Sequence, residues 1–151
     1  MNVYLAGPMR GHSEDTANGW RKVAATYLKS HGIRALSPLR GNLGLDLNPD
    51  HPLLNPQGVN TQNLFDIRRS DMMLVNAVGV ARPSVGTILE IGYAYAKDTP
   101  VVLAVEDEDF HNEPLIRDMV GWRVRTLEAA LAVVVHVLAP TDWKGDVFHA
   151  S

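Results

Sequence analysis

Short apolar runs alternate five times with segments of helical spacing, and this alternation constrains the fold more than any other feature of the chain. The apolar runs are residues 2–6, 33–37, 71–76, 100–105 and 122–125, and the helical segments are residues 13–32, 59–70, 84–98, 112–121 and 126–138. Short apolar runs bounded by glycine or proline are typical of buried strands. Right-handed crossovers would place the helices on both faces of one parallel sheet. We therefore predict an α/β fold, a single-domain, Rossmann-like or flavodoxin-like, doubly wound five-stranded parallel sheet.

We expect one domain over residues 1–151, because this length is close to that of a typical domain and no internal repeat divides the chain. The segment 38–58 is rich in proline, glycine and asparagine. A loop this long is typical of a lid or binding loop, or else it is disordered, and we expect it to border the active site. Residues 139–151 form a polar C-terminal tail.

Composition and charge argue against several classes of protein. The chain has no cysteine, which excludes disulfides, thiolate chemistry and Cys-ligated metals, and its six histidines show no ligand spacing. We therefore expect no metal and no cofactor. The net charge of −3 gives no reason to expect nucleic acid or a membrane as partner. We find no signal peptide and no apolar run of about 20 residues, so we expect a cytoplasmic protein.

The loops that follow the strands are the expected place for a ligand. In doubly wound sheets, ligands bind outside the carboxyl ends of the strands, near the point where the strand order reverses. Here those loops are residues 7–12, 38–58, 77–84 and 106–112. Arg10, the long loop, Ser84 and Glu90 should therefore converge on one side of the sheet.

The first loop, Gly7-Pro-Met-Arg-Gly11, matches neither the dinucleotide fingerprint nor a P-loop. It still offers backbone N–H groups and the Arg10 guanidinium beside a helix N-terminus, which is a reasonable place for a phosphate. Ser84 and the amides of Gly86 and Thr87 could form the other half of an anion cradle. In the alternative interpretation, the loop glycines only make a turn and Arg10 is solvated.

Glu90 is the one acid on the helix that begins after Ser84, and apolar residues surround it. It either caps or solvates the helix start or has a chemical task, because carboxylates are rarely buried without a partner or a function. A carboxylate nucleophile suits displacement at the anomeric carbon of a sugar, if one group orients it and an acid protonates the leaving group. Tyr4 points either into the packing or toward this site. Asp66 and Asp71 flank the start of the third strand, and either could lack a catalytic role.

Three segments resemble the nucleoside 2-deoxyribosyltransferase superfamily, which includes the transferases and the 2′-deoxynucleoside 5′-monophosphate N-glycosidases. They are Tyr4-Leu-Ala-Gly-Pro-Met-Arg10, Asn63-Leu-Phe-Asp-Ile-Arg-Arg-Ser-Asp71 and Ser84-Val-Gly-Thr-Ile-Leu-Glu-Ile-Gly-Tyr-Ala94. The resemblance extends over about residues 2–138, and the third segment is the most specific of the three.

The resemblance implies roles for individual residues. Glu90 matches the nucleophilic glutamate of the family, and Tyr4 matches the tyrosine that hydrogen-bonds to it. The transferases usually have an aspartate where this chain has Ser84, whereas the monophosphate glycosidases have a serine there for the 5′-phosphate and an arginine that matches Arg10. An aspartate would repel a phosphate, so this pair favours a nucleotide substrate. The implied substrate-binding residues are Gly7, Met9, Arg10, Asn63, Ser84, Gly86 and Thr87.

Asn63 departs from the family pattern, in which an aspartate at this position binds the base and handles the proton of the leaving group. Asparagine can hydrogen-bond a base but carries no transferable proton at pH 7. Either Asp66, one helical turn further on, substitutes for it, or another group protonates the base, or the enzyme is slow. We list Asp66 with Glu90 and Tyr4 as catalytic candidates.

The sequence thus predicts an enzyme that cleaves the N-glycosidic bond of a 2′-deoxynucleoside 5′-monophosphate through a covalent deoxyribosyl intermediate on Glu90, resolved by water. One alternative is base exchange on free deoxynucleosides, and another is a non-catalytic nucleotide-binding module, which Asn63 alone supports. A third alternative, a flavodoxin-like redox or signalling domain, predicts either a flavin-binding loop or an acid cluster with a phosphorylatable aspartate at the end of the third strand, where this chain has Asn76. The resemblance also implies a homodimer or larger oligomer, with Arg117 or Asp118 able to reach a partner's site.

Overall fold

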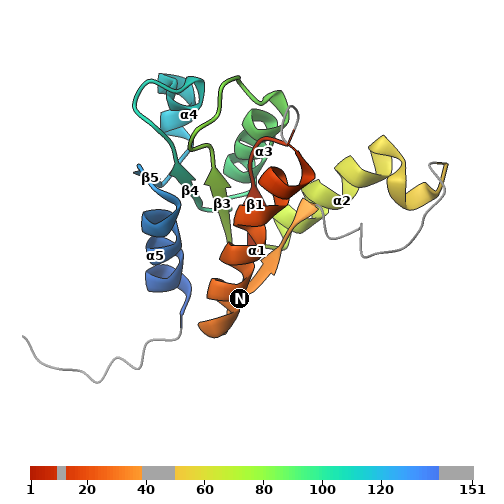
Figure 1. Ribbon diagram of the computed structural model, residues 1–151, viewed down its shortest axis with the longest axis horizontal. Helices are drawn as coiled ribbons and strands as arrows, with labels where there is room; N and C mark the ends of the chain where they lie inside the picture. The colour runs from red at the N-terminus through yellow and green to blue at the C-terminus, as the bar shows by residue number, and fades with distance from the viewer. Residues whose placement is uncertain (10–12, 39–49, 140–151) are drawn as a thin grey trace, which may run out of the picture.

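A five-stranded parallel sheet forms the centre of the computed structural model, which describes residues 1–9, 13–38 and 50–139 (Figure 1). The strand order is β2-β1-β3-β4-β5, and every neighbouring pair is parallel. The strands are β1 (Asn2–Ala6), β2 (Arg34–Leu36), β3 (Met72–Asn76), β4 (Val101–Ala104) and β5 (Trp122–Val124). This order is that of flavodoxin-like sheets, so the predicted fold class is confirmed.

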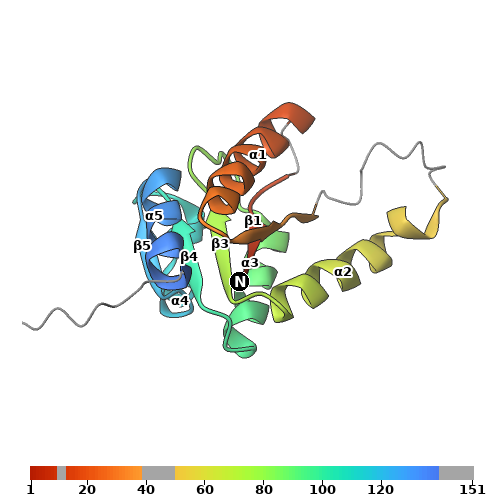
Figure 2. The same ribbon diagram turned by 90° about the horizontal axis from the view of Figure 1, so that it is seen from below.

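Helices cover both faces of the sheet (Figures 1 and 2). One face packs against α1 (Glu14–Ser30) and α5 (Leu127–Leu138), and the other packs against α2 (Pro56–Arg68), α3 (Val85–Ala96) and α4 (Pro114–Asp118). The alternation of side chains along β1 follows this division, because Val3 and Leu5 pack with α1 and α5 whereas Tyr4 and Ala6 pack with α2, α3 and α4. Tyr4 is therefore on the α3 side of the sheet.

Side-chain caps set the helix starts. Ser13 and Thr126 accept hydrogen bonds from the N–H groups of Thr16 and Ala129, so α1 and α5 begin where the sequence predicts. The prediction for α2 is wrong by three residues: the helix begins at Pro56 instead of Val59, because Asn55 caps it and proline is well tolerated at the first helical position. It ends at Arg68, two residues earlier than predicted.

The sequence predicts a helical segment that starts at Asn112 before β5, with the Asn112 side chain as its cap, and this prediction is wrong. The 3₁₀ helix η3 (Phe110–Asn112) precedes α4, and Asp109 caps η3. The N-cap residue of α4 is Glu113, whose side chain makes no capping hydrogen bond. The Asn112 side chain instead donates to the carbonyl oxygen of Asp107, at 2.7 Å, and so closes the loop after β4.

The strand order reverses between β1 and β3, and glycine permits the close approach of the chain there. A Cβ atom on Gly7, just after β1, would lie 2.7 Å from the carbonyl oxygen of Asn76 at the end of β3 and 3.1 Å from the Trp20 ring. A contact of 2.7 Å is too short for a side chain, so this position accepts glycine alone without a shift of the backbone. The first loop is thereby held against the carboxyl end of β3, where ligands bind in this fold.

Parts of three predicted segments lie outside the described residues, namely 10–12 of the first loop, 39–49 of the long loop and 140–151 of the tail. The rest of the long loop includes the 3₁₀ helix η2 (Pro52–Leu54) and the first turn of α2. No helix in the described parts of the chain is long and apolar enough to span a membrane. Among the same residues, no three His, Cys, Asp or Glu side chains gather in a way that could hold a metal ion.

Candidate active site

Glu90 and Tyr4 meet at the centre of the candidate site. Glu90 is in the second turn of α3, and the Tyr4 hydroxyl donates a hydrogen bond to its Oε1 atom at 2.9 Å. The two residues are 86 positions apart in sequence, and the packing of α3 over β1 brings them together. The hydrogen bond that the sequence predicts is therefore present, and it aims one carboxylate oxygen of Glu90 at Tyr4.

Burial dominates the electrostatics of this pair. It raises the pKa of Glu90, and the hydrogen bond from Tyr4 and the positive charge of Arg21 oppose that increase. Burial also raises the pKa of Tyr4 far above its usual value, and the negative charge of Glu90 raises it further. Tyr4 therefore remains a neutral donor at any physiological pH. The arrangement holds a poorly solvated carboxylate in a fixed orientation, as an activated nucleophile requires.

Arg21 is a site residue that the sequence analysis missed. Its side chain is only 3% exposed, and its guanidinium donates to the carbonyl oxygens of Leu5, at 3.4 Å, of Gly7, at 2.9 Å, and of Ala17. It also lies 4.5 Å from the centre of the Trp20 ring. Burial lowers its pKa to about 10, so Arg21 is still protonated at neutral pH. It supplies a fixed positive charge near Tyr4 and Glu90 and fixes the start of the first loop.

The sequence did contain a signal for Arg21. Ala17, Ala24 and Leu28 are buried on one face of α1, and Arg21 occupies the position between them at helical spacing. A charged residue on a buried helix face needs partners. Those partners are mainly backbone carbonyl groups, which no side-chain motif reveals.

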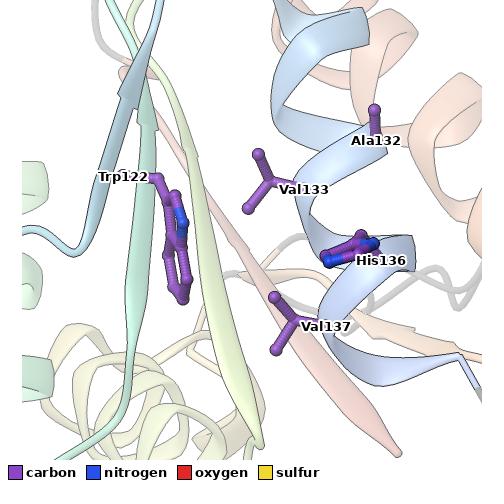
Figure 3. A pocket seen from close by; sticks show the side chains of 5 residues that line it. All are labelled: Trp122, Ala132, Val133, His136 and Val137. Carbon is purple, nitrogen blue, oxygen red and sulfur yellow. The ribbon is translucent and has the colours of Figure 1, made fainter. Parts of the chain in front are cut away.

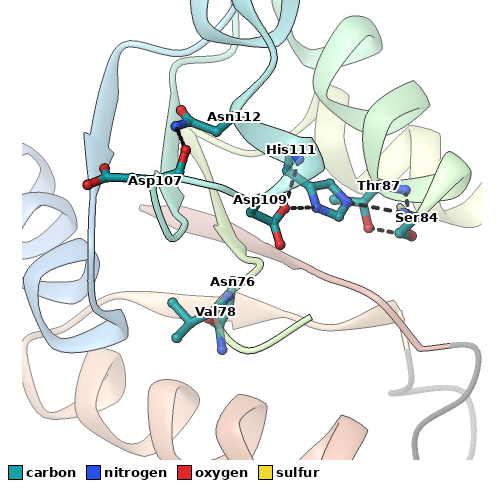
Figure 4. Close-up of polar contacts among 8 residues, drawn as sticks. All are labelled: Asn76, Val78, Ser84, Thr87, Asp107, Asp109, His111 and Asn112. Atoms are coloured by element: carbon teal, nitrogen blue, oxygen red, sulfur yellow. Dashed lines mark hydrogen bonds and ion pairs between the residues drawn. The ribbon is translucent and has the colours of Figure 1, made fainter. Parts of the chain in front are cut away.

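Ser84 caps α3 and is tightly bound to Thr87 (Figure 4). The Ser84 hydroxyl oxygen accepts hydrogen bonds from the Thr87 N–H group, at 3.3 Å, and from the Thr87 hydroxyl, at 2.9 Å. The Thr87 amide, which we expected to face an anion, is therefore occupied by Ser84, and Thr87 itself is buried. Gly86 is exposed, and a Cβ atom there would find no atom within 4 Å. Space for a ligand therefore lies beside the start of α3.

Helix α2 contributes Asn63 and Asp66, and both are buried. The Asn63 Oδ1 atom has no hydrogen-bond partner within the described residues, so it can still accept a hydrogen bond. Asp66 forms an ion pair with Arg69, with distances of 2.9 Å and 2.8 Å from its Oδ1 atom to Nε and Nη2. The charge of Asp66 also contributes to the raised pKa of Tyr4. The helix thus brings both predicted residues to the side of the sheet that holds Tyr4.

Of the remaining candidate residues, Asp71 lies away from the site and Met9 lies in the first loop. Asp71 accepts a hydrogen bond from the Asn2 N–H group at 2.6 Å, at the amino end of the strands and away from the site, so its role is structural. Met9 is 36% exposed in the first loop. Arg10 lies outside the described residues, and its predicted contact with a phosphate stays a prediction.

A separate apolar groove lies between β5 and α5 (Figure 3). The residues that line it are Trp122, Ala132, Val133, His136 and Val137. The groove shares no residue with the candidate site, and α5 lies on the opposite face of the sheet from α3.

The family model for nucleoside 2-deoxyribosyltransferase matches residues 3–144. No curated protein sequence matches the chain.

Solved structures show the same fold. A 2-deoxyribosyltransferase from Bacillus psychrosaccharolyticus is 19% identical, with a TM-score of 0.65 over 95% of this chain and 93% of that chain. A conserved protein from Enterococcus faecalis V583 is 18% identical, with a TM-score of 0.68 over 91% of this chain and 98% of that chain. A CMP N-glycosidase from Clostridium botulinum is 18% identical, with a TM-score of 0.57 over 91% of this chain and 100% of that chain.

The raised pKa of Glu90 predicts that Glu90→Gln stabilises the protein at neutral pH. Because burial favours the protonated form, ionising Glu90 lowers the free energy of unfolding once the pH exceeds its unfolded pKa of about 4.3. Glutamine removes that charge and can still accept the hydrogen bond from Tyr4. The gain should be present at pH 7 and should disappear as the pH falls below about 4.3, where the wild-type carboxyl is protonated in both states.

Urea unfolding at several pH values measures this effect. Glu108→Gln is the matched control, because Glu108 is exposed. A Glu90→Gln variant that is less stable than the wild type at pH 7 would contradict the electrostatic account.

Proposed function

The chain belongs to the nucleoside 2-deoxyribosyltransferase family, whose members act on the glycosidic bonds of nucleosides, and from this premise we propose that it hydrolyses the N-glycosidic bond of a 2′-deoxynucleoside 5′-monophosphate. The observation that carries the proposal is the hydrogen bond from Tyr4 to the partly buried Glu90. Tyr4 lies in the middle of β1, one of the two strands between which the strand order reverses, and Glu90 lies on α3, which packs over the same face of the sheet. A buried, oriented carboxylate at this position suits nucleophilic attack on a sugar carbon.

In the proposed mechanism Glu90 attacks with its free oxygen. Its Oε1 atom accepts the hydrogen bond from Tyr4, and Oε2 has no hydrogen bond within the described residues. Oε2 bonds to the anomeric carbon as the bond from that carbon to the base breaks, and the base leaves with the bonding electrons and takes up a proton. Water then attacks the anomeric carbon and gives up a proton, which replaces the proton that the base took up. The ester bond breaks, and Glu90 returns as a carboxylate while 2-deoxyribose 5-phosphate leaves.

The leaving base would meet α2. The unpaired Oδ1 atom of Asn63 can accept a hydrogen bond from an amino or ring N–H group of the base. We keep Asp66 as the candidate that handles the proton of the leaving base, because it is buried on α2 one turn after Asn63. Its carboxylate would have to take up a proton before it could donate one. The ion pair between Asp66 and Arg69 is equally consistent with a purely structural role for Asp66.

The start of α3 supports a phosphate in preference to a neutral 5′-hydroxyl. Both acceptor positions of the Ser84 oxygen are occupied by Thr87, so the Ser84 hydroxyl hydrogen is left to donate to a ligand. A helix N-terminus favours an anion, and the open space at Gly86 lets one approach the backbone. Gly7, Met9 and Arg10 would complete the cradle from the first loop.

Two other functions remain as outcomes of the same test. A second base could take the place of water, which would make the protein a transferase on free deoxynucleosides. A non-catalytic nucleotide-binding module would retain the cradle without the chemistry, and Asn63 in place of a proton-carrying residue is the observation that favours it.

We also propose a homodimer or larger oligomer. Val85 and Leu89, one turn apart on α3, are 69% and 67% exposed, and Phe65 on the neighbouring α2 is 49% exposed. Large apolar side chains on two packed helices suit contact with a second copy of the chain. Such a contact would place a partner beside the helix that carries Glu90, and the exposed Arg117 and Asp118 of α4 are candidates to reach a partner's site.

Base release from a set of 2′-deoxynucleosides and their 5′-monophosphates tests the proposed function. We expect release from monophosphates without a free acceptor base, and a loss of roughly a thousandfold or more in kcat for Glu90→Gln. Glu128→Gln, an exposed change on α5, should keep full activity. Exchange only in the presence of a second base would support the transferase instead, and no release from any substrate would overturn the enzymatic proposal.

Ser84→Asp tests the choice of substrate. A carboxylate at this position would repel a 5′-phosphate, so kcat/KM for the monophosphate relative to the free nucleoside should fall by about tenfold or more. Ser84→Asn is the control, because asparagine also caps helices but carries no charge. An equal change in the ratio for both variants would show that charge is not the cause.

Leu89→Lys tests the oligomer. We expect sedimentation velocity to show a dimer or larger species for the wild type and a shift toward monomer for this variant, since a charge would have to be buried in the contact. Val23→Lys is the matched control, because Val23 is also exposed but lies on α1, on the opposite face of the sheet. A monomeric wild type would refute the proposal.

A further inference from the structure

A buried histidine outside the catalytic pair connects the loop after β4 to the start of α3. His111 is fully buried in η3, and both of its ring nitrogens have partners (Figure 4). Its Nδ1 atom lies 2.6 Å from the Asp109 carboxylate, and its Nε2 atom lies 3.1 Å from the backbone nitrogen of Ser84. No step of the proposed mechanism uses this histidine.

The partners of His111 determine which nitrogen carries the proton. The Ser84 N–H group can only donate, so Nε2 must offer its lone pair. The proton is then on Nδ1, where it is donated to Asp109. The same Asp109 oxygen also accepts the backbone N–H of His111, at 2.7 Å. Asp109 thereby holds both the tautomer and the position of the ring.

This bond completes the immobilisation of Ser84. The N–H group of Ser84 donates to His111, and the carbonyl oxygen of Ser84 accepts a hydrogen bond from the Ile88 N–H group at 3.0 Å. Thr87 occupies both acceptor positions of the Ser84 hydroxyl oxygen. The hydroxyl hydrogen is the one polar group of Ser84 left for a ligand. A group that can only donate is best matched by an oxygen that can only accept, as in a phosphate dianion.

From this geometry we propose that Asp109 and His111 are positioning residues that fix Ser84 as a donor to the 5′-phosphate and so determine the preference for a monophosphate over a free nucleoside. The proposal rests on the proposed function. It adds two residues from the acidic loop after β4, whose charges would otherwise disfavour a phosphate nearby. The imidazole of His111 lies between the Asp109 carboxylate and Ser84. The carboxylate therefore orients His111 and does not contact the phosphate directly.

Other contacts hold the loop after β4 independently of the Asp109–His111–Ser84 hydrogen bonds, which we call the relay. The Asn112 side chain donates to the Asp107 carbonyl oxygen, and the Asp107 carboxylate forms an ion pair with Arg125. Asp107 is thus an acid of the same loop with a different partner. Removing its charge gives a matched control for removing that of Asp109.

The first experiment is NMR of the histidine side chains in the whole protein, with long-range ¹H–¹⁵N correlations assigned by the loss of the His111 signals in His111→Phe. We expect His111 to be neutral and protonated at Nδ1 in the wild type. In Asp109→Ala the acceptor for that proton is gone, and the Nδ1–H signature should be lost. A wild-type His111 protonated at Nε2 would overturn the proposal, whatever substrate the protein uses.

The second experiment measures KM and kcat for a 2′-deoxynucleoside and its 5′-monophosphate. In Asp109→Ala the preference for the monophosphate should fall about tenfold, chiefly through its KM, because a charge-assisted hydrogen bond loses its orientation. Asp109→Asn retains an oxygen that accepts both hydrogen bonds, so it should restore most of the preference. Asp107→Ala should leave the preference unchanged.

The possible outcomes distinguish failure of the proposed positioning role of Asp109 and His111 from failure of the proposed function. Equal losses for both substrates in Asp109→Ala would indicate a general structural role and would overturn the relay while the proposed function stands. An unchanged preference would do the same. If the wild-type protein releases no base, the proposed function fails, and the tautomer of His111 then decides whether Asp109 and His111 hold Ser84 as described.

Discussion

The burial of the Glu90 carboxylate is the constraint on which the rest of the structure depends. A charge that leaves water is costly unless hydrogen bonds and an opposite charge compensate it. Tyr4 supplies the hydrogen bond and Arg21 supplies the charge, and they reach Glu90 from different elements, β1 and α1. The three groups work only if both faces of the sheet are packed, because Arg21 is on α1 and Glu90 is on α3. The reactive group is therefore coupled to the folding of the whole domain.

Arg21 couples the charge balance of the site to the backbone of the first loop. Its guanidinium binds the Gly7 carbonyl oxygen, and Gly7 in turn has no room for a side chain against the end of β3. The loop that is expected to meet the phosphate thus starts from a point fixed by the same residue whose positive charge opposes the increase in the pKa of Glu90.

Local sequence patterns were sufficient for the fold and for part of the site. Short apolar runs mark all five strands, and Ser13, Ser84 and Thr126 mark helix starts, because each of these signals acts within a few residues. The start of α2 was missed because Pro56 was assigned to the loop although Asn55 caps the helix. Arg21 and His111 were missed because their partners include backbone groups distant in sequence, such as the Leu5 carbonyl and the Ser84 N–H. Such partners leave no motif.

Under the proposed function, Ser84 selects the 5′ group of the substrate and Glu90 carries the reaction, and the helix between these two residues fixes their separation. Ser84 is the N-cap and Glu90 is six residues further on, so about 9 Å of helix axis joins the donor at the 5′ end to the attacking carboxylate. Each end is held from outside α3, Ser84 by His111 and Glu90 by Tyr4. Because the two supports come from different loops and strands, a change in one can alter the preferred 5′ group while the nucleophile keeps its orientation. This separation gives the fold a physical route to different 5′ groups with one reaction mechanism.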